Sequence, residues 1–452
     1  MDDQGPASEA DAAPSRSGVF SRLPTLLREP LYTSALYLWI SAASVGLGGL
    51  AYWALTARLY DPDDVGRASA ALSVLVFIGM FSHLGFGLGL IRFLPDSPDE
   101  GPRLVNVVFT ASVAFAIVAS AVFLVGLPWW TPSLGFLREN LLHTVAIVAF
   151  AVSAVSVTVQ SHVFLAIRRA KYILAQTVLL VLARVVVVIL MASFFGAFGI
   201  VAAWGLATVL AMLMGFALLA GSFTGYRPKA VVDPAAMRMM APFSAGNHLA
   251  DSVLLVPSLL MPLLVVSLVG SEEAAYFFMA WFLGLLVSTA SWHLSLSLFT
   301  EGSHDPGALR VLSRNAVAGG LVIATAGAAF LFLLGDKILL VFGQDYSDQG
   351  VTLLRIVAVT AIPAAVVNGY FGALRVMKRI GELVIIAGVV AATTITLSLL
   401  LLPPMGLEGA GVGYAAGQVL GLTIVLIRVI ALTDGTIWQR LRWLSAGPGT
   451  GS

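Results

Sequence analysis

Long apolar runs alternate with short polar connections between Leu31 and Ile430. Each run is long enough to cross a hydrocarbon layer about 30 Å thick, which takes roughly 20 helical residues. Lipid cannot hydrogen-bond exposed backbone groups, so these runs are predicted to be helices. The predicted spans are residues 31–58, 65–93, 105–127, 141–166, 171–195, 197–221, 241–269, 273–298, 310–334, 350–374, 381–402 and 408–430.

The composition agrees with a chain that is solvated by lipid. Of its 452 residues, 59% are hydrophobic and only 11% are charged, and the mean hydropathy is +0.94. Water-soluble domains carry about a quarter charged residues. No cysteine is present, which excludes disulfides and thiolate chemistry, and no lysine precedes Ser or Thr, which excludes a Walker A loop. The predicted fold class is therefore an all-α integral membrane protein with twelve transmembrane helices.

Basic residues gather on one side of the predicted membrane. Sorting the 25 Lys and Arg residues by connection places nineteen on one side and four on the other, with Arg184 and Arg355 inside spans. The four on the other side are Arg58, Arg67, Arg138 and Lys337. Cytoplasmic loops are enriched in Lys and Arg. We therefore predict a multi-pass protein of the cytoplasmic (inner) membrane with both termini in the cytoplasm.

The chain repeats itself in two halves. FLAIRRAKYI (164–173) returns as FGALRVMKRI (371–380) after 207 residues, and GAFGIVAAWG (196–205) returns as GLEGAGVGYA (406–415) after 210. The repeat predicts two lobes of six helices. The expected parts are a tail (1–30), an N-terminal lobe (31–221), a linker (222–240), a C-terminal lobe (241–430) and a second tail (431–452).

The even number of spans in each half fixes the symmetry. Both halves enter the membrane from the same side, so a pseudo-two-fold axis along the membrane normal must relate them. A ligand at their interface would lie on this central axis. Two lobes that rock against each other would open the interface to each face of the membrane in turn.

The acidic turn RLYDPDDVGRA (58–68) allows two interpretations. Its aspartates are Asp61, Asp63 and Asp64. They could form the metal-binding loop of a membrane glycosyltransferase, or they could start a helix, with Asp61 as N-cap and Pro62 in the first helical position. The matching residues of the second half are Ser271, Glu272 and Glu273. A cap followed by acids in both halves favours the structural role, so neither a catalytic residue nor a metal site is predicted.

The segment from residue 55 to 96 resembles the opening of polysaccharide-biosynthesis flippases. These belong to the multidrug/oligosaccharidyl-lipid/polysaccharide (MOP) exporter superfamily. The similar features are an Ala-Arg-Leu run, an acidic turn with Gly, and a Gly-rich stretch closed by Arg-Phe. VFGQDYSDQGVTLLRIVAV (341–359) resembles the segment that leads into the tenth span of the same proteins.

The resemblance implies a secondary transporter without a cofactor. Its substrate would be a polyprenyl-diphosphate-linked oligosaccharide, moved from the inner to the outer leaflet. The implied partners are this lipid-linked substrate, membrane lipids and a coupling ion, H⁺ or Na⁺, with no nucleic acid. Two alternatives stay open: a multidrug or toxin extruder of the same superfamily, and a membrane glycosyltransferase or polymerase.

By the same resemblance, the first, second, seventh and eighth spans line the central cavity. The polar residues singled out within these spans are His83, Asn247, His248, Asp251 and His293. An Asp at a helix centre costs about 2.5–3.5 kcal/mol on insertion scales, so such groups need a role. We expect Asp251 and His248, on one helical face, to bind the coupling ion, and His83, His293 and Asn247 to contact substrate. The alternative is hydrogen bonding between the lobes or contact with water.

The lining spans hold no Lys or Arg at mid-depth. Arg58 and Arg67 lie at the expected outer mouth of the cavity and Arg92 at the inner mouth. Either these three contact the phosphate groups, or the bound group is less anionic than the resemblance implies. Arg184 is expected to stay within its lobe as a partner of His162 or Gln160.

Overall fold

The computed structural model describes residues 30–95, 100–192, 195–223 and 226–433. Within these ranges the chain is helical and contains no strand. Twelve of the described helices are long and apolar enough to cross a membrane, which confirms the predicted fold class. The expected tails lie outside these ranges, except where the first and last helices extend into them.

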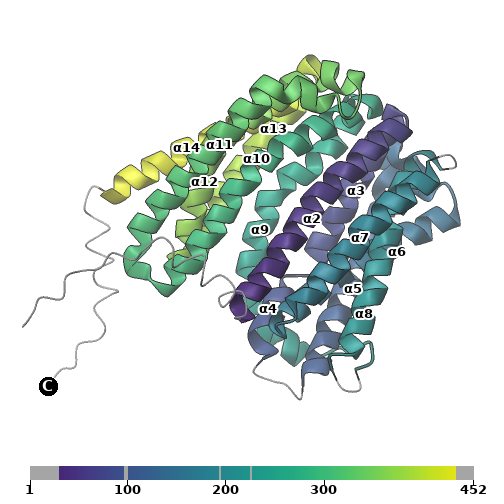
Figure 1. Cartoon of the computed structure of the whole chain (residues 1–452), viewed down its shortest axis with the longest axis vertical. Helices are drawn as coiled ribbons and strands as arrows, with labels where there is room; N and C mark the ends of the chain where they lie inside the picture. Colours follow the sequence, from purple (N-terminus) through teal and green to yellow (C-terminus); the bar gives the residue numbers. More distant parts are fainter. Residues whose placement is uncertain (1–29, 96–99, 193–194, 224–225, 434–452) are drawn as a thin grey trace, which may run out of the picture.

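The helices form two groups that lie side by side (Figure 1). The N-terminal lobe contains α2 (Pro30–Leu59), α3 (Pro62–Ser82), α4 (Phe86–Phe93), α5 (Gly101–Trp130), the short η1 (Pro132–Arg138), α6 (Leu141–Ala166), α7 (Ala170–Met191) and α8 (Gly196–Ala220). The C-terminal lobe contains α9 (Pro234–Leu268), α10 (Ser271–His304), η2 (Pro306–Ala308), α11 (Leu309–Leu339), α12 (Gln344–Val376), α13 (Ile380–Met405) and α14 (Leu407–Thr433).

The two ends of the bundle differ in charge. We call the end where α3 and α10 begin the acidic end, because both helices carry acids in their first turns. The opposite end, where α4 and α12 end, is called the basic end, since both helices carry an Arg in their last turns. The charge distribution predicts that the acidic end faces outward and the basic end faces the cytoplasm.

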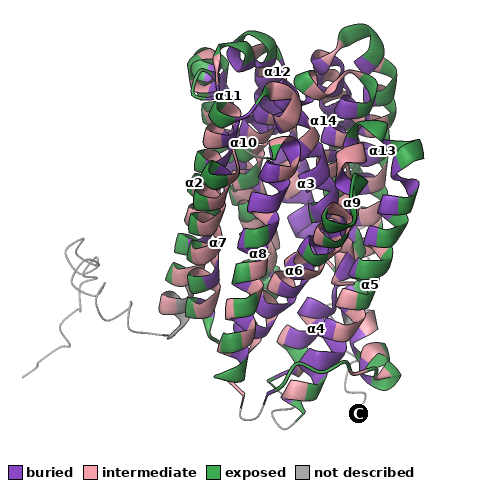
Figure 2. Cartoon of the chain, turned by 90° about the vertical axis from the view of Figure 1, so that its right-hand side faces the viewer, coloured by how far each residue is buried: buried purple, intermediate pink, exposed green. Residues whose placement is uncertain are grey.

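Burial separates central helices from peripheral ones. In α3, 72% of the most apolar stretch is buried, whereas the corresponding share in α7 is 11% (Figure 2). Apolar side chains on an outer helix can face lipid, which is as apolar as a protein core. The helix α3 is therefore central and packs against both lobes.

The second predicted span is broken rather than continuous. The helix α3 ends at Ser82 and α4 begins at Phe86, so the prediction of one helix over 65–93 was wrong. Leu84 and Gly85 adopt left-handed φ angles of 51° and 72°. A Cβ on Gly85 would lie 2.7 Å from Cβ of His248, so glycine lets α9 pass close to this turn.

The seventh helix begins earlier than predicted. α9 starts at Pro234, inside the expected linker, because Asp233 caps it by accepting hydrogen bonds from the backbone N–H groups of Ala235 and Ala236 at 3.0 and 3.1 Å. The first turns of α9 pack against the N-terminal lobe, where Met240 joins a buried cluster with Leu90 and Phe164. This helix therefore contacts both lobes.

The repeat is real, but one part of its register was wrong. The turns after α6 and after α12 each contain one non-glycine residue with φ 56°, Arg168 and Lys378, and these are 210 positions apart. The sequence match with a spacing of 207 is therefore three residues out of register. Structural equivalence follows from the matching turn geometry and not from the similar Arg and Lys residues. Gly196 and Gly406 are also 210 apart, and both have left-handed φ angles, as the second match predicts.

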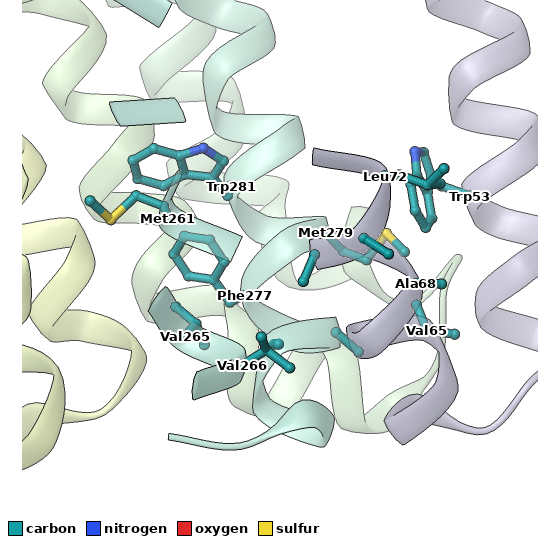
Figure 3. Packing of buried hydrophobic residues seen from close by; sticks show 14 of the residues in the cluster. Trp53, Val65, Ala68, Leu72, Met261, Val265, Val266, Phe277, Met279 and Trp281 are labelled. Carbon is teal, nitrogen blue, oxygen red and sulfur yellow. The ribbon is translucent and has the colours of Figure 1, made fainter. Parts of the chain in front are cut away.

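The lobes meet closely at the acidic end. Met279 of α10 lies beside Val65, Ala68 and Leu72 of α3 in a shared apolar cluster (Figure 3). A Cβ on Gly66 would lie 1.6 Å from the carbonyl oxygen of Ser271, so the two backbones touch there. This contact closes the acidic end of the interface between the lobes.

Polar contacts hold the same end. Arg58 of α2 donates from Nε to the carbonyl of Val341 at 2.9 Å and from Nη2 to that of Leu340 at 2.5 Å. Ser267 of α9 donates to the hydroxyl of Thr131 at 3.2 Å. Each of these bonds joins one lobe to the other.

Candidate functional site

A cavity of about 620 Å³ lies among α9, α10, α12, α13 and α14, toward the basic end of the bundle. The turn between α3 and α4, together with α6, adds wall from the N-terminal lobe. Most of the lining is aliphatic or aromatic. Its ionisable side chains are His83, His162, His248, Asp251 and Tyr414. A mostly apolar cavity with a few convergent polar groups is typical of a small-molecule or lipid site.

An ion pair connects the cavity lining, which includes Asp251, to Arg375 behind it. Arg375, in the last turn of α12, donates from Nη2 to Oδ1 of Asp251 on α9 at 2.6 Å. Its Cζ atom lies 5.5 Å from the ring centroid of Trp292 on α10, within range of a cation–π contact. The Arg375 side chain is 6% exposed and the Asp251 side chain is 39% exposed.

Sequence reasoning missed Arg375. It was assigned to a connection between spans, whereas α12 continues to Val376 and buries this side chain. The presence of an acid inside the seventh span called for a cationic partner, but the sequence did not say which of the many basic-end residues would reach it.

Three imidazole rings gather beside the ion pair. The ring centroids of His83 and His248 are 4.7 Å apart, and those of His83 and His162 are 5.9 Å apart. Nδ1 of His83 accepts a hydrogen bond from the Gly85 amide at 3.1 Å, and Nδ1 of His162 lies 2.8 Å from the Thr158 carbonyl. The structure thus brings together the expected His83 and His248, and it adds His162 from α6.

Other predicted site residues lie elsewhere. His293 is exposed and does not line the cavity, although its neighbour Trp292 does. Arg92 is exposed in the last turn of α4. The backbone of Asn247 belongs to α9, but its side chain lies outside the described residues.

The two arginines at the acidic end take part in the contact between the lobes. Arg58 is bonded to the end of α11, as described above, and Arg67 pairs with Asp63 one turn before it. Asp63 also accepts a hydrogen bond from the Ser271 hydroxyl of the other lobe. These arginines therefore lie far from the cavity and serve the closed end of the interface.

The acidic turns are helix starts in both lobes. Asp61 is at the N-cap of α3 and Pro62 at its first position, as predicted, although the Asp61 side chain makes no capping bond. In the other lobe the N-cap is Gly270, so the prediction that Ser271 is the cap was wrong by one residue. Ser271 instead uses its hydroxyl to reach Asp63.

Arg184 does not pair with His162 or Gln160. Its guanidinium lies 4.8 Å from the ring centroid of Trp204 on α8, within the same lobe. Gln160 instead accepts from Gln176 at 2.7 Å and donates to the Met212 carbonyl at 3.0 Å. Gln160 lies six residues before the end of α6, whereas Arg184 lies fourteen residues after the start of α7 at the same end of the bundle. At 1.5 Å of rise per residue, the two residues therefore differ in depth by about 12 Å, too far apart for the predicted contact.

Within the described residues, no group of three or more His, Asp or Glu side chains is arranged to hold a metal ion. Among the described lining residues the carboxylate is Asp251, which is paired with Arg375 behind it, and the other polar groups are imidazole, hydroxyl and amide groups. Such a set can recognise a ligand that combines charge, hydroxyl groups and an apolar part.

Comparison with known proteins gives both a family and a fold. The family model described as polysaccharide biosynthesis protein matches residues 31–291. An inward-facing multidrug resistance MATE family transporter of the MOP superfamily has a TM-score of 0.66 at 15% identity, covering 89% of this chain and 99% of its own. The lipid II flippase MurJ, in an inward closed conformation, has a TM-score of 0.71 at 11% identity, covering 92% and 94%.

A MOP superfamily transporter from Pyrococcus furiosus is also similar, with a TM-score of 0.59 at 14% identity, covering 90% of this chain and 98% of its own. At such identities the likeness shows a common fold. A search among curated proteins found no sequence match. The predicted resemblance to the MOP superfamily is confirmed by the family match together with the shared fold.

Proposed function

The chain belongs to the polysaccharide biosynthesis protein family, and we propose that it moves a polyprenyl-diphosphate-linked oligosaccharide from the inner to the outer leaflet. Transport would proceed by alternating access between the two lobes. The protein would act as a secondary transporter in the cytoplasmic membrane, with both termini in the cytoplasm and without enzymatic chemistry.

The observation that carries this proposal is the one-sided arrangement of the interface. The lobes touch through backbone and side chains at the acidic end, while the cavity lies toward the basic end. In the predicted orientation, a ligand from the cytoplasmic leaflet would enter from the basic end. Separation of Arg58 from the end of α11, and of α3 from α10, would then release it outward.

The cavity chemistry suits an amphiphilic ligand better than a purely apolar one. Apolar side chains such as Val253, Leu254 and Phe371 provide surface for a prenyl chain, and Asn368 and Gln418 provide hydrogen-bonding groups for sugar hydroxyls. His83 and His248 would contact the headgroup from the lobe interface. We retain Asn247 of α9 as a further candidate for substrate contact.

Asp251 and His248 are the candidates for ion coupling, with H⁺ or Na⁺ as the ion. Asp251 is already paired with Arg375, so an ion would bind there only when that pair is broken. Substitution of Asp251 by Asn should stop translocation while expression is maintained. Full transport by this variant would remove Asp251 from the coupling step.

A multidrug extruder is the second candidate function, since multidrug resistance transporters share the fold. A site for cationic drugs needs an available negative charge, whereas the Asp251 carboxylate is neutralised by Arg375. The pairing therefore favours an anionic or zwitterionic ligand. A membrane glycosyltransferase is disfavoured because Asp63 contacts Arg67 and Ser271 in a structural role.

Deletion of the gene tests the function directly. The flippase proposal predicts accumulation of a lipid-linked sugar on the inner leaflet, with no change in resistance to cationic drugs. Lost drug efflux without such accumulation would support the extruder instead. An essential Asp63 together with lost glycosyl transfer would support the enzyme.

A further inference from the structure

Arg375 is a cation held almost wholly out of solvent behind two lining residues of the cavity, Asp251 and Trp292. Its side chain is 6% exposed, at the end of a membrane-spanning helix, and its guanidinium is backed by the ring of Trp292. A buried guanidinium needs an anionic partner, since an unpaired buried charge is strongly unfavourable. The side chain cannot move away easily, so the partner can change more readily than Arg375 itself.

Its partner has the opposite character. Asp251 is 39% exposed and belongs to the cavity lining, so its carboxylate can be hydrated when it leaves the guanidinium. An incoming anion can reach Arg375 by taking the position of this carboxylate. The pair thus combines a fixed buried cation with an exchangeable anion that faces the ligand space.

The neighbouring charge cluster of the same lobe shows the reverse arrangement. Glu382 is 12% exposed and pairs with Arg379 at 2.5 Å and with Arg428 at 3.5 Å, and these two arginines are 41% and 57% exposed. Tyr370 also donates to Glu382, at 3.0 Å. There the acid is fixed and the bases face outward, so an external anion would gain no buried cation.

We propose that Arg375 is the binding residue for the phosphate or diphosphate group of the substrate, and that Asp251 occupies this position until the anion arrives. The planar guanidinium offers two parallel N–H donors to phosphate oxygens, which makes it well suited to a bidentate contact. The Trp292 ring holds the plane of the guanidinium in place. The nature of the ligand rests on the proposed function, while the anion site rests on the geometry of the pair.

The two partners should then respond in opposite directions. Arg375→Gln removes the anion site and should weaken binding of a diphosphate by about tenfold or more, the size expected for a lost charge-assisted hydrogen bond. Asp251→Asn removes the competing anion and should tighten the same binding. If the salt bridge had only a structural role, the two variants would change diphosphate binding in the same direction, or neither would change it.

Binding of farnesyl diphosphate to the purified full chain in detergent provides the test, measured by calorimetry. Farnesol, which lacks the charge, and inorganic pyrophosphate, which lacks the chain, separate recognition of the amphiphile from recognition of the anion alone. The matched control is Arg379→Gln, which removes a positive charge from the same end of the same lobe and should leave binding unchanged.

Thermal unfolding with and without farnesyl diphosphate provides a second measurement for variants that are less stable than the wild type. Asp251→Asn leaves Arg375 unpaired, so its melting temperature should be lower than that of the wild type. Farnesyl diphosphate should raise the melting temperature of this variant by more than it raises that of the wild type. Arg375→Lys, which keeps the charge and loses the bidentate geometry, serves as the milder variant should Arg375→Gln not fold, and it should bind more weakly than the wild type.

Equal binding to the wild type and to the Arg375 variants would overturn the proposal, and so would a failure of the wild type to bind farnesyl diphosphate. Weaker binding in Asp251→Asn would also overturn it. These outcomes leave the proposed function standing if deletion still causes a lipid-linked sugar to accumulate. Absence of that accumulation, with diphosphate binding through Arg375 intact, would instead contradict the function and retain the anion site.

Discussion

The two lobes share a backbone plan but differ in where they place charge. The turn after α6 and the turn after α12 have the same geometry 210 positions apart, so the position that corresponds to Arg375 in the N-terminal lobe is Leu165. The repeat offset is 209 between the starts of α3 and α10 and 210 at the turns. The positions of the N-terminal lobe that correspond to Asp251 at these offsets are Ala42 and Ser41. The ion pair of the C-terminal lobe therefore has no charged equivalent in the other lobe.

The interior of the N-terminal lobe holds a neutral polar pair and one cation, Arg184, which contacts the Trp204 ring. Gln160 and Gln176 form a buried pair that also bonds to the backbone of α8. Three of the four polar atoms of this pair are hydrogen-bonded within the lobe, and Oε1 of Gln176 has no partner among the described residues. The Arg375 cation differs, because its partner Asp251 faces the cavity and can exchange for an incoming anion. The difference indicates that the shared plan provides the two-lobed frame, while the C-terminal lobe provides the ion pair next to the cavity and the N-terminal lobe adds His83 and His162 to its lining.

The largest expected effect comes from Gly66, where the two lobes touch. Gly66→Ala places a Cβ 1.6 Å from the Ser271 carbonyl oxygen, so α3 and α10 cannot approach as they do here. Disulfide formation between Thr131→Cys and Ser267→Cys should drop to near zero in this background. Gly46→Ala, whose added Cβ meets nothing within 4 Å, is the matched control and should cross-link normally.

A smaller effect is expected from the glutamine pair. Gln176→Leu removes its bonds to Gln160 and to the Ala211 carbonyl and leaves buried acceptors unpaired, which should destabilise the protein by about 1–3 kcal/mol. The change should lower the melting temperature without altering binding of farnesyl diphosphate. Altered binding at unchanged stability would show that the Gln160–Gln176 pair takes part in recognition.

Arg58 should control the balance between the two access states. Arg58→Gln removes the charge-assisted hydrogen bonds to the Leu340 and Val341 carbonyls. A hydrogen bond to a charged group typically contributes about 1.5–3 kcal/mol. Because Arg58 is exposed, a value at the lower end is expected. The same cross-linking pair should form more slowly, yet still form. An unchanged rate would mean that the apolar contact alone closes this end.

The smallest effect is expected from Arg103. Its pair with Asp233 at 2.8 Å has an Arg side chain that is 58% exposed, and exposed ion pairs contribute about 0–1 kcal/mol. Arg103→Gln should therefore change neither the melting temperature nor ligand binding measurably. A large loss of stability would indicate that the start of α9 is held mainly by this pair rather than by the Asp233 cap.

The sequence predicts the frame better than the site. Hydropathy was sufficient for twelve spans, because a helix in lipid needs a long apolar run whatever it packs against. It could not show the break at Gly85, which depends on how closely α9 passes. The 207-residue spacing was wrong because similar Arg and Lys residues lie at different turn positions in the two halves.

For the site, the sequence indicated His83, His248 and Asp251 because polar residues inside spans are rare. It did not indicate Arg375, since a residue at the end of a span can either reach solvent or turn inward, and only the packing of α12 against α9 and α10 decides. His162 was noticed but given the wrong neighbour, because the sequence does not fix relative depth.

The most direct test of alternating access is labelling of a single cysteine in the cavity. Ser288→Cys, a lining position, would be exposed to a membrane-impermeant maleimide from either face, with and without the oxidised Thr131→Cys and Ser267→Cys cross-link. We expect labelling from both faces in the free protein and only from the basic-end face once the acidic end is cross-linked. Labelling from the acidic-end face in the cross-linked protein would contradict the account.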